Sequence, residues 1–175
     1  MDKEIIMKFF VKNKVFTLRG SSYVLDEQGN NAYEVKGKYF TFTNKKFIRD
    51  MQGNNLYMVR NKYWHFIRRS IYIYEYKDGK YEKMCRIFAP WFTKWKIKNY
   101  GDHNFDIEGG FLSAIGGILL KDGETQLGKY ASSFDLASIC IRDAYVVDVF
   151  EPNYAAFLVS AAVGLDNIRD GNDRR

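Results

Sequence analysis

The alternation of apolar and polar residues predicts β-strands along most of the chain. Between residues 91 and 98, Trp95 and Ile97 fall on one side of an extended backbone, together with Trp91. Three lysines fall on the other side: Lys94, Lys96 and Lys98. Successive side chains of a strand point to opposite faces, so this period of two indicates a strand with one buried and one wet face. The same alternation recurs over residues 33–36 and 138–142.

A repeated segment predicts how these strands are joined. The stretch at residues 23–31, with Asp, Gly and two Asn at its end, recurs at residues 47–55, so that Gly29 and Gly53 occupy equivalent places. Glycine and asparagine adopt a positive φ at low cost, which tight hairpin turns require. Asp-Gly pairs at residues 78–79 and 122–123 mark two further turns. Together these features predict a meander of antiparallel hairpins.

The pattern changes at Pro152, which suits the first turn of a helix. Residues 153–165 carry no charge, and this predicts one C-terminal helix over about residues 152–166 that is apolar on every side. Such a helix must be covered all round, and only strands are available to cover it. Small residues keep it thin: Ala155, Ala156, Ser160, Ala161, Ala162 and Gly164. The interior of an eight-stranded barrel is filled by its own side chains and has no room for a helix. The expected fold is therefore mostly β, a closed antiparallel barrel of about twelve strands around one buried hydrophobic C-terminal helix.

Composition agrees with one globular domain. The chain has 175 residues, 46% of them hydrophobic, and we expect a single domain over residues 1–168 followed by a polar tail over 169–175. The uncharged stretch is shorter than the roughly 20 residues that a membrane span needs. There is no Asn-x-Ser/Thr site, and the charged start lacks the pattern of a signal peptide. These features favour a cytoplasmic protein.

Residues that carry chemistry are few. The segment from Gly123 to Lys129 has the spacing of a phosphate-binding loop, but Tyr130 stands where a Ser or Thr should bind Mg²⁺. We therefore interpret Gly123 and Gly128 as hairpin turns. The remaining candidates, His65, His103, Cys85, Cys140, Asp102, Asp106 and Glu108, form no pattern of nucleophile, base or metal ligands. The sequence predicts no catalytic residue, cofactor or metal, and thus no enzyme.

Basic residues provide the one candidate surface. The 27 Lys and Arg outnumber the 21 Asp and Glu, which gives a net charge of +6. Basic side chains in strand-like segments define a tentative anionic-ligand patch: Lys45, Lys46, Arg49, Arg60, Lys62, Arg68, Arg69, Lys94, Lys96 and Lys98. Such residues can meet the phosphates of lipid or nucleic acid. They also deter aggregation of strand edges as an ordinary solvated surface.

The hairpin repeats, the strand at residues 33–40 and the segment at residues 142–152 before the Ala-rich helix resemble the LURP-one-related family, which is grouped with tubby-like C-terminal domains and phospholipid scramblases. The resemblance covers residues 5–168. It implies a closed twelve-stranded barrel around a hydrophobic helix, in agreement with the helix argument. It also implies a non-enzymatic binding or scaffold domain that binds an anionic membrane surface or phosphoinositide as a peripheral protein. The alternatives are a nucleic-acid-binding β domain and a protein-interaction module without a small ligand.

Overall fold

The computed structural model describes residues 3–12, 21–37, 45–61, 69–89, 94–109, 117–132 and 144–170. These ranges contain twelve strands, one short 3₁₀ helix and one α-helix. The elements are β1 (Met7–Lys12), β2 (Ser21–Leu25), β3 (Asn31–Gly37), β4 (Lys46–Arg49), β5 (Asn55–Asn61), β6 (Arg69–Lys77), β7 (Lys80–Ala89), β8 (Lys96–Asn99), β9 (Phe105–Glu108), β10 (Ile118–Asp122), β11 (Thr125–Ser132), β12 (Ala144–Val149), η3 (Pro152–Tyr154) and α1 (Ala155–Asp170).

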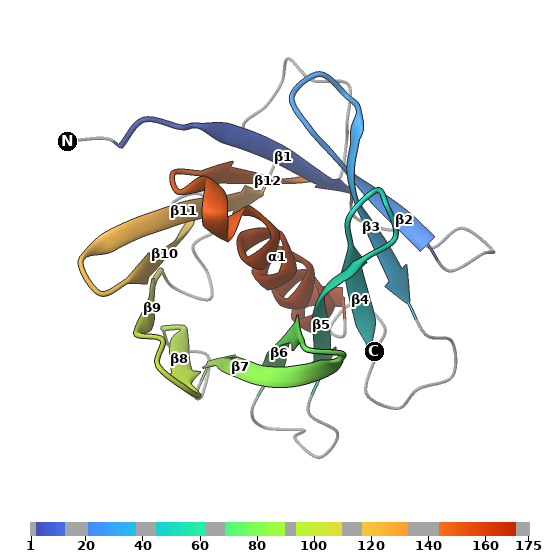
Figure 1. Ribbon diagram of the computed structural model, residues 1–175. Coiled ribbons are helices and arrows are strands. Elements are labelled where there is room, and N and C mark those ends of the chain that lie inside the picture. Colours follow the sequence, from blue (N-terminus) through green and yellow to red (C-terminus); the bar gives the residue numbers. More distant parts are fainter. Residues whose placement is uncertain are drawn as a thin grey trace.

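The strands form one antiparallel sheet that curls into a nearly closed barrel (Figure 1). Their order is β8-β7-β6-β5-β4-β3-β2-β1-β12-β11-β10-β9, so most neighbours are also consecutive in sequence. The predicted fold class and strand number are confirmed. The predicted closure needs a correction, because β8 and β9 are the two edges of the sheet and no strand ladder joins them.

Within the described ranges, the Asn99 side chain makes two hydrogen bonds across the gap between β8 and β9. The Trp95 amide donates a 3.4 Å hydrogen bond to the Gly109 carbonyl. Farther along, Asn99 Nδ2 donates to the Phe105 carbonyl at 2.9 Å, and the Phe105 amide donates to Asn99 Oδ1 at 3.2 Å. The Asn99 amide group therefore takes the place that a backbone peptide holds in a regular ladder.

Turn chemistry sets the repeated hairpins, as predicted. Asp26 Oδ1 accepts hydrogen bonds from the amides of Gln28 and Asn30 at 3.0 and 2.8 Å. Asp50 repeats this arrangement with the two equivalent residues of the second copy. Both turn glycines have positive φ, +82° and +88°. Each carboxylate thus satisfies the amides that the reversal leaves without partners.

Helix α1 runs through the ring of strands (Figure 1) and contacts β1, β5, β6, β11 and β12. Every side chain from Phe157 to Val163 is buried, as is Leu165. The helix ends at Asp170 and not near residue 166 as predicted, since the next residue that favours termination is Gly171. Among the described residues, no helix is long and apolar enough to cross a membrane.

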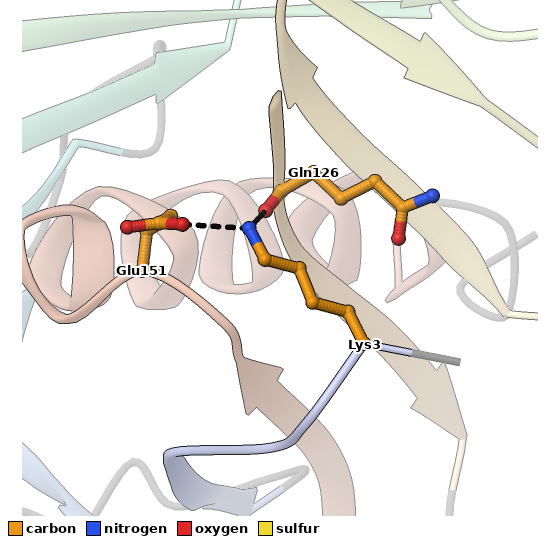
Figure 2. Close-up of polar contacts among 3 residues, drawn as sticks. All are labelled: Lys3, Gln126 and Glu151. Atoms are coloured by element: carbon orange, nitrogen blue, oxygen red, sulfur yellow. Dashed lines mark hydrogen bonds and ion pairs between the residues drawn. The ribbon is translucent and has the colours of Figure 1, made fainter. Parts of the chain in front are cut away.

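An N-terminal lysine ties the start of the chain to the entrance of α1. Lys3 Nζ donates to Glu151 Oε1 at 2.6 Å and to the Gln126 carbonyl at 2.9 Å (Figure 2). Glu151 immediately precedes η3. The ammonium group therefore joins the N-terminal segment, β11 and the turn before the helix.

A candidate ligand-binding face on the barrel

One row of side chains crosses four strands on the outside of the barrel. Arg60 on β5 pairs with Tyr72 on β6, Tyr72 pairs with Arg86 on β7, and Arg86 pairs with Lys98 on β8. Directly paired residues point to the same side of a sheet. Ile71 and Ile73, the neighbours of Tyr72, are completely buried on the inner side, so the row faces outward. We call this row and its neighbours the basic–aromatic face: Arg60, Tyr72, Tyr74, Lys83, Arg86, Phe88, Lys94, Lys96, Lys98 and Tyr100.

Tyr72 lies at the centre of three cationic side chains. Lys83 Nζ is 5.2 Å from the Tyr72 ring centroid, Arg86 Cζ is 5.7 Å from it and Arg60 Cζ is 6.0 Å from it. These distances fall within the range of attraction between a cation and an aromatic ring. The tyrosine ring therefore holds together positive charges that repel one another.

Neighbouring rings extend the same arrangement. Lys83 Nζ is also 4.9 Å from the Tyr100 ring centroid, and Lys98 Nζ is 5.6 Å from it. Arg86 Cζ lies 4.9 Å from the Phe88 ring, and Arg60 Cζ lies 5.7 Å from the Tyr74 ring. The side chains of Tyr72, Tyr74, Phe88 and Tyr100 are all partly exposed. Part of each ring surface is thus already occupied by a cation.

Positive charge on this face is not balanced by carboxylates. Among the described residues, the ion pairs are made by Lys3, Lys8, Lys77, Lys80 and Lys121, which all lie outside the face. The Nε atoms of Arg60 and Arg86 are inaccessible to solvent and have no hydrogen-bond partner within the described part of the chain. Burial raises the pKa of Tyr74, and the nearby Arg60 charge only partly offsets this, so the hydroxyl stays neutral. The arrangement is suited to an anion.

The structure brings some of the predicted basic residues together and separates others. Lys96 and Lys98 are exposed on the outer side of β8, and Lys94, which precedes this strand, is also exposed, while Trp95 is buried, as the alternation predicted. Lys98 belongs to the same row as Arg60 and is separated from it by β6 and β7. Arg49 lies on β4, where its Nε donates to Asn55 Oδ1 at 2.9 Å.

The other predicted basic residues do not contribute to the face as predicted, or lie outside the described residues. Lys45 directly precedes β4 and is half-buried. Lys46 is only 5% exposed and shares the inner side of β4 with Ile48, so it is not part of the outer surface. Arg69 begins β6, but its side chain lies outside the described part of the structure. Lys62 and Arg68 also lie outside the described residues.

Sequence reasoning missed Lys83 and Arg86. These residues are three positions apart, so strict alternation would place them on opposite faces. The register between β6 and β7 shifts where Ile73 pairs with Cys85 and Tyr74 pairs with Lys83. Met84 is therefore an extra residue in β7, a β-bulge that turns both basic side chains outward. Nothing in the sequence marks this bulge.

The other candidates do not assemble into a reactive site. Within the described ranges, no group of three or more His, Cys, Asp or Glu side chains is placed to hold a metal. Gly123 lies in the β10–β11 turn as predicted, but Gly128 lies within β11, so its interpretation as a turn residue is wrong. His103 stacks on Phe105 at 4.7 Å. Burial raises the pKa of Cys85 to about 12. His65 and Cys140 lie outside the described residues.

Comparisons with known proteins agree on the fold. The model of the LURP-one-related family matches residues 7–166. The crystal structure of a protein from Arabidopsis thaliana is similar to the chain, with a TM-score of 0.60 and 17% sequence identity. The similarity covers 93% of this chain and 91% of the Arabidopsis chain. No curated protein sequence matches the chain.

Proposed function

Because the chain belongs to the LURP-one-related family, we propose that it is a non-catalytic binding domain whose basic–aromatic face binds anionic phospholipid headgroups. The observation that carries the proposal is the row Arg60, Tyr72, Arg86 and Lys98, whose cations have no acidic partner among the described residues. Uncompensated positive charge on a protein surface attracts the phosphates of an anionic membrane. The protein would act as a peripheral membrane protein on the cytoplasmic side.

The occupied aromatic rings favour lipid over single-stranded nucleic acid. Proteins that bind single strands without sequence preference stack successive bases on open aromatic rings. Here Tyr72 and Tyr100 are each approached by at least two cationic groups, so a base would have to displace them. A lipid headgroup needs only the cations. Nucleic-acid binding remains the alternative, and the experiment below compares an oligonucleotide with vesicles.

Vesicle cosedimentation at about 0.15 M salt tests the proposal, with neutral phosphatidylcholine compared with phosphatidylcholine that contains phosphatidylserine. We expect binding only to the anionic vesicles. The variant Lys94→Gln/Lys96→Gln/Lys98→Gln should bind them less, by about fivefold for each charge removed. The control Lys36→Gln/Lys77→Gln/Lys80→Gln removes the same charge from exposed positions outside the face and should change binding little.

Two results would contradict the proposal. One is equal binding, or no binding, to neutral and anionic vesicles. The other is equal loss in the two triple variants, which would show that net charge alone drives attraction. A single-stranded oligonucleotide that binds at the same salt more tightly than the vesicles would instead support the nucleic-acid alternative.

A further inference from the structure

Three cations converge on one tyrosine in the middle of the basic–aromatic face. Arg60 comes from β5, and Lys83 and Arg86 come from β7, on either side of Tyr72 on β6. All three charged groups lie within 6.0 Å of the same ring centroid. We call Arg60, Lys83 and Arg86 the three-cation site.

The two arginines are held by the fold rather than by polar partners. Both Nε atoms are shielded from solvent, and neither meets a hydrogen-bond acceptor in the described part of the chain. The terminal nitrogens of the two guanidinium groups are not shielded in this way, so they are the donors that an anion can reach. Each guanidinium lies against a second ring, Tyr74 for Arg60 and Phe88 for Arg86. These contacts limit the movement of the guanidinium groups before any ligand arrives.

We propose that the three-cation site binds one phosphate monoester and discriminates it from a phosphate diester. A monoester has three terminal oxygens and a charge of about −1.5 to −2 near pH 7. One guanidinium group can donate two parallel hydrogen bonds to two such oxygens, whereas an ammonium group acts as a point charge. The site has three cationic groups for three terminal oxygens, and its charge of +3 is enough to neutralise a dianion. A diester has two terminal oxygens and one charge, and leaves part of the site unsatisfied.

The bulge in β7 explains why the site exists at this place. Without the extra residue at Met84, Lys83 and Arg86 would point to opposite sides of β7. The lysines on and just before β8 differ. Within the described residues, neither Lys94 nor Lys96 places its charge over an aromatic ring, and Lys98 does so only over Tyr100. They add diffuse positive charge, and the three-cation site adds recognition of the phosphate itself.

This inference rests on the proposed function, and the experiment separates the two. Binding is measured to vesicles that contain phosphatidic acid, a monoester, and to vesicles of equal surface charge that contain phosphatidylserine, a diester. The wild-type protein should prefer the monoester vesicles roughly tenfold, as expected for charge-assisted hydrogen bonds. Glycerol 3-phosphate, titrated by calorimetry, tests the free monoester in solution.

Two variants that remove equal charge locate the preference. Arg60→Gln/Lys83→Gln/Arg86→Gln should lose the preference for the monoester while it keeps weakened binding to phosphatidylserine. Lys94→Gln/Lys96→Gln/Lys98→Gln should bind both vesicles less and keep their ratio. Arg60→Lys/Arg86→Lys keeps the charge and loses the paired hydrogen bonds, so it should also lose the preference. The Arg60→Lys/Arg86→Lys variant tests the site even if Arg60→Gln/Lys83→Gln/Arg86→Gln fails to fold, which circular dichroism would reveal.

The outcomes are distinguishable. Equal wild-type binding to both anionic vesicles overturns the three-cation site and leaves the proposed function standing. Loss of the preference in the β8 variant also overturns it, because the selectivity would then come from diffuse charge. Binding of glycerol 3-phosphate without vesicle binding supports the site and refutes the lipid surface. Failure of both vesicles and glycerol 3-phosphate to bind refutes both proposals.

Discussion

Two glycines show how closely α1 approaches the sheet. A Cβ atom on Gly128 of β11 would lie 2.5 Å from the Asp148 carbonyl oxygen and 2.6 Å from Leu158 Cδ1. A Cβ on Gly164 of α1 would lie 2.2 Å from Ile71 Cδ1. Small residues on the helix were predicted to make it thin, and Gly164 fits that reasoning. The requirement at Gly128 was missed, because Gly128 was interpreted as a hairpin-turn residue, whereas it lies within β11.

Gly128→Ala should therefore destabilise the protein by about 1–3 kcal/mol, the range for overpacking a well-packed core. Asp148 O belongs to the backbone of the neighbouring strand β12 and cannot rotate away as a side chain can. Urea unfolding monitored by circular dichroism measures the change. Gly29→Asn is the control, since no atom lies within 4 Å of a Cβ there and asparagine tolerates its positive φ. Equal stability of Gly128→Ala and wild type would mean that α1 does not approach β11 this closely.

At the scale of the elements, the join between β8 and β9 depends on the Asn99 side chain. Every other neighbouring pair in the sheet has a ladder of backbone hydrogen bonds, whereas Asn99 supplies two of the bonds described across this join. Hydrophobic alternation predicted a strand over residues 91–98, of which β8 covers Lys96–Asn99 and residues 91–93 lie outside the described residues, but it contains no information about which strand edges meet. Closure of the barrel was inferred from the uncharged helix, and the weak join escaped that reasoning.

Asn99→Ala should loosen this join without unfolding the rest of the barrel. Loss of both side-chain bonds leaves the amide and carbonyl of Phe105 with fewer partners, at a cost of about 1–3 kcal/mol. Hydrogen exchange should become faster in β8 and β9 and remain unchanged in β5 and β6, because proteins open locally in cooperative units. Asn31→Ala, at an exposed strand position, is the control. Uniformly faster exchange would contradict a local role for Asn99.

For the whole molecule, the sequence predicted more of the architecture than of the surface. The fold class, the strand number and the C-terminal helix followed from period-two alternation and one uncharged segment, which are local signals. The basic–aromatic face depends on register and on the bulge at Met84, which arise only when β6 and β7 pair. Lys46 shows the same limit, because its inward direction depends on the phase of β4 relative to the core.

Two titratable groups that burial keeps neutral make the free energy of unfolding fall at alkaline pH. Burial raises the pKa of the Cys85 thiol to about 12. Burial also raises the pKa of Tyr57, and the negative charge of Glu75 raises it further. Both groups are therefore neutral in the folded protein at a pH where the unfolded chain has released their protons, near 8.5 for Cys and about 10 for Tyr. Because the unfolded state then binds fewer protons, stability falls as pH rises.

These two groups should therefore add little pH dependence to the free energy of unfolding below about pH 8. Above about pH 9 the free energy should decline, by up to about 1.4 kcal/mol per pH unit for each group. Urea unfolding at a series of pH values tests this. Cys85→Ala removes one titrating group, so its stability should approach that of the wild type as pH rises towards 12, although it is less stable at pH 7. Tyr57→Phe should show the same convergence from a higher starting pH. Curves that stay parallel across this range would show that neither group is held neutral by the fold.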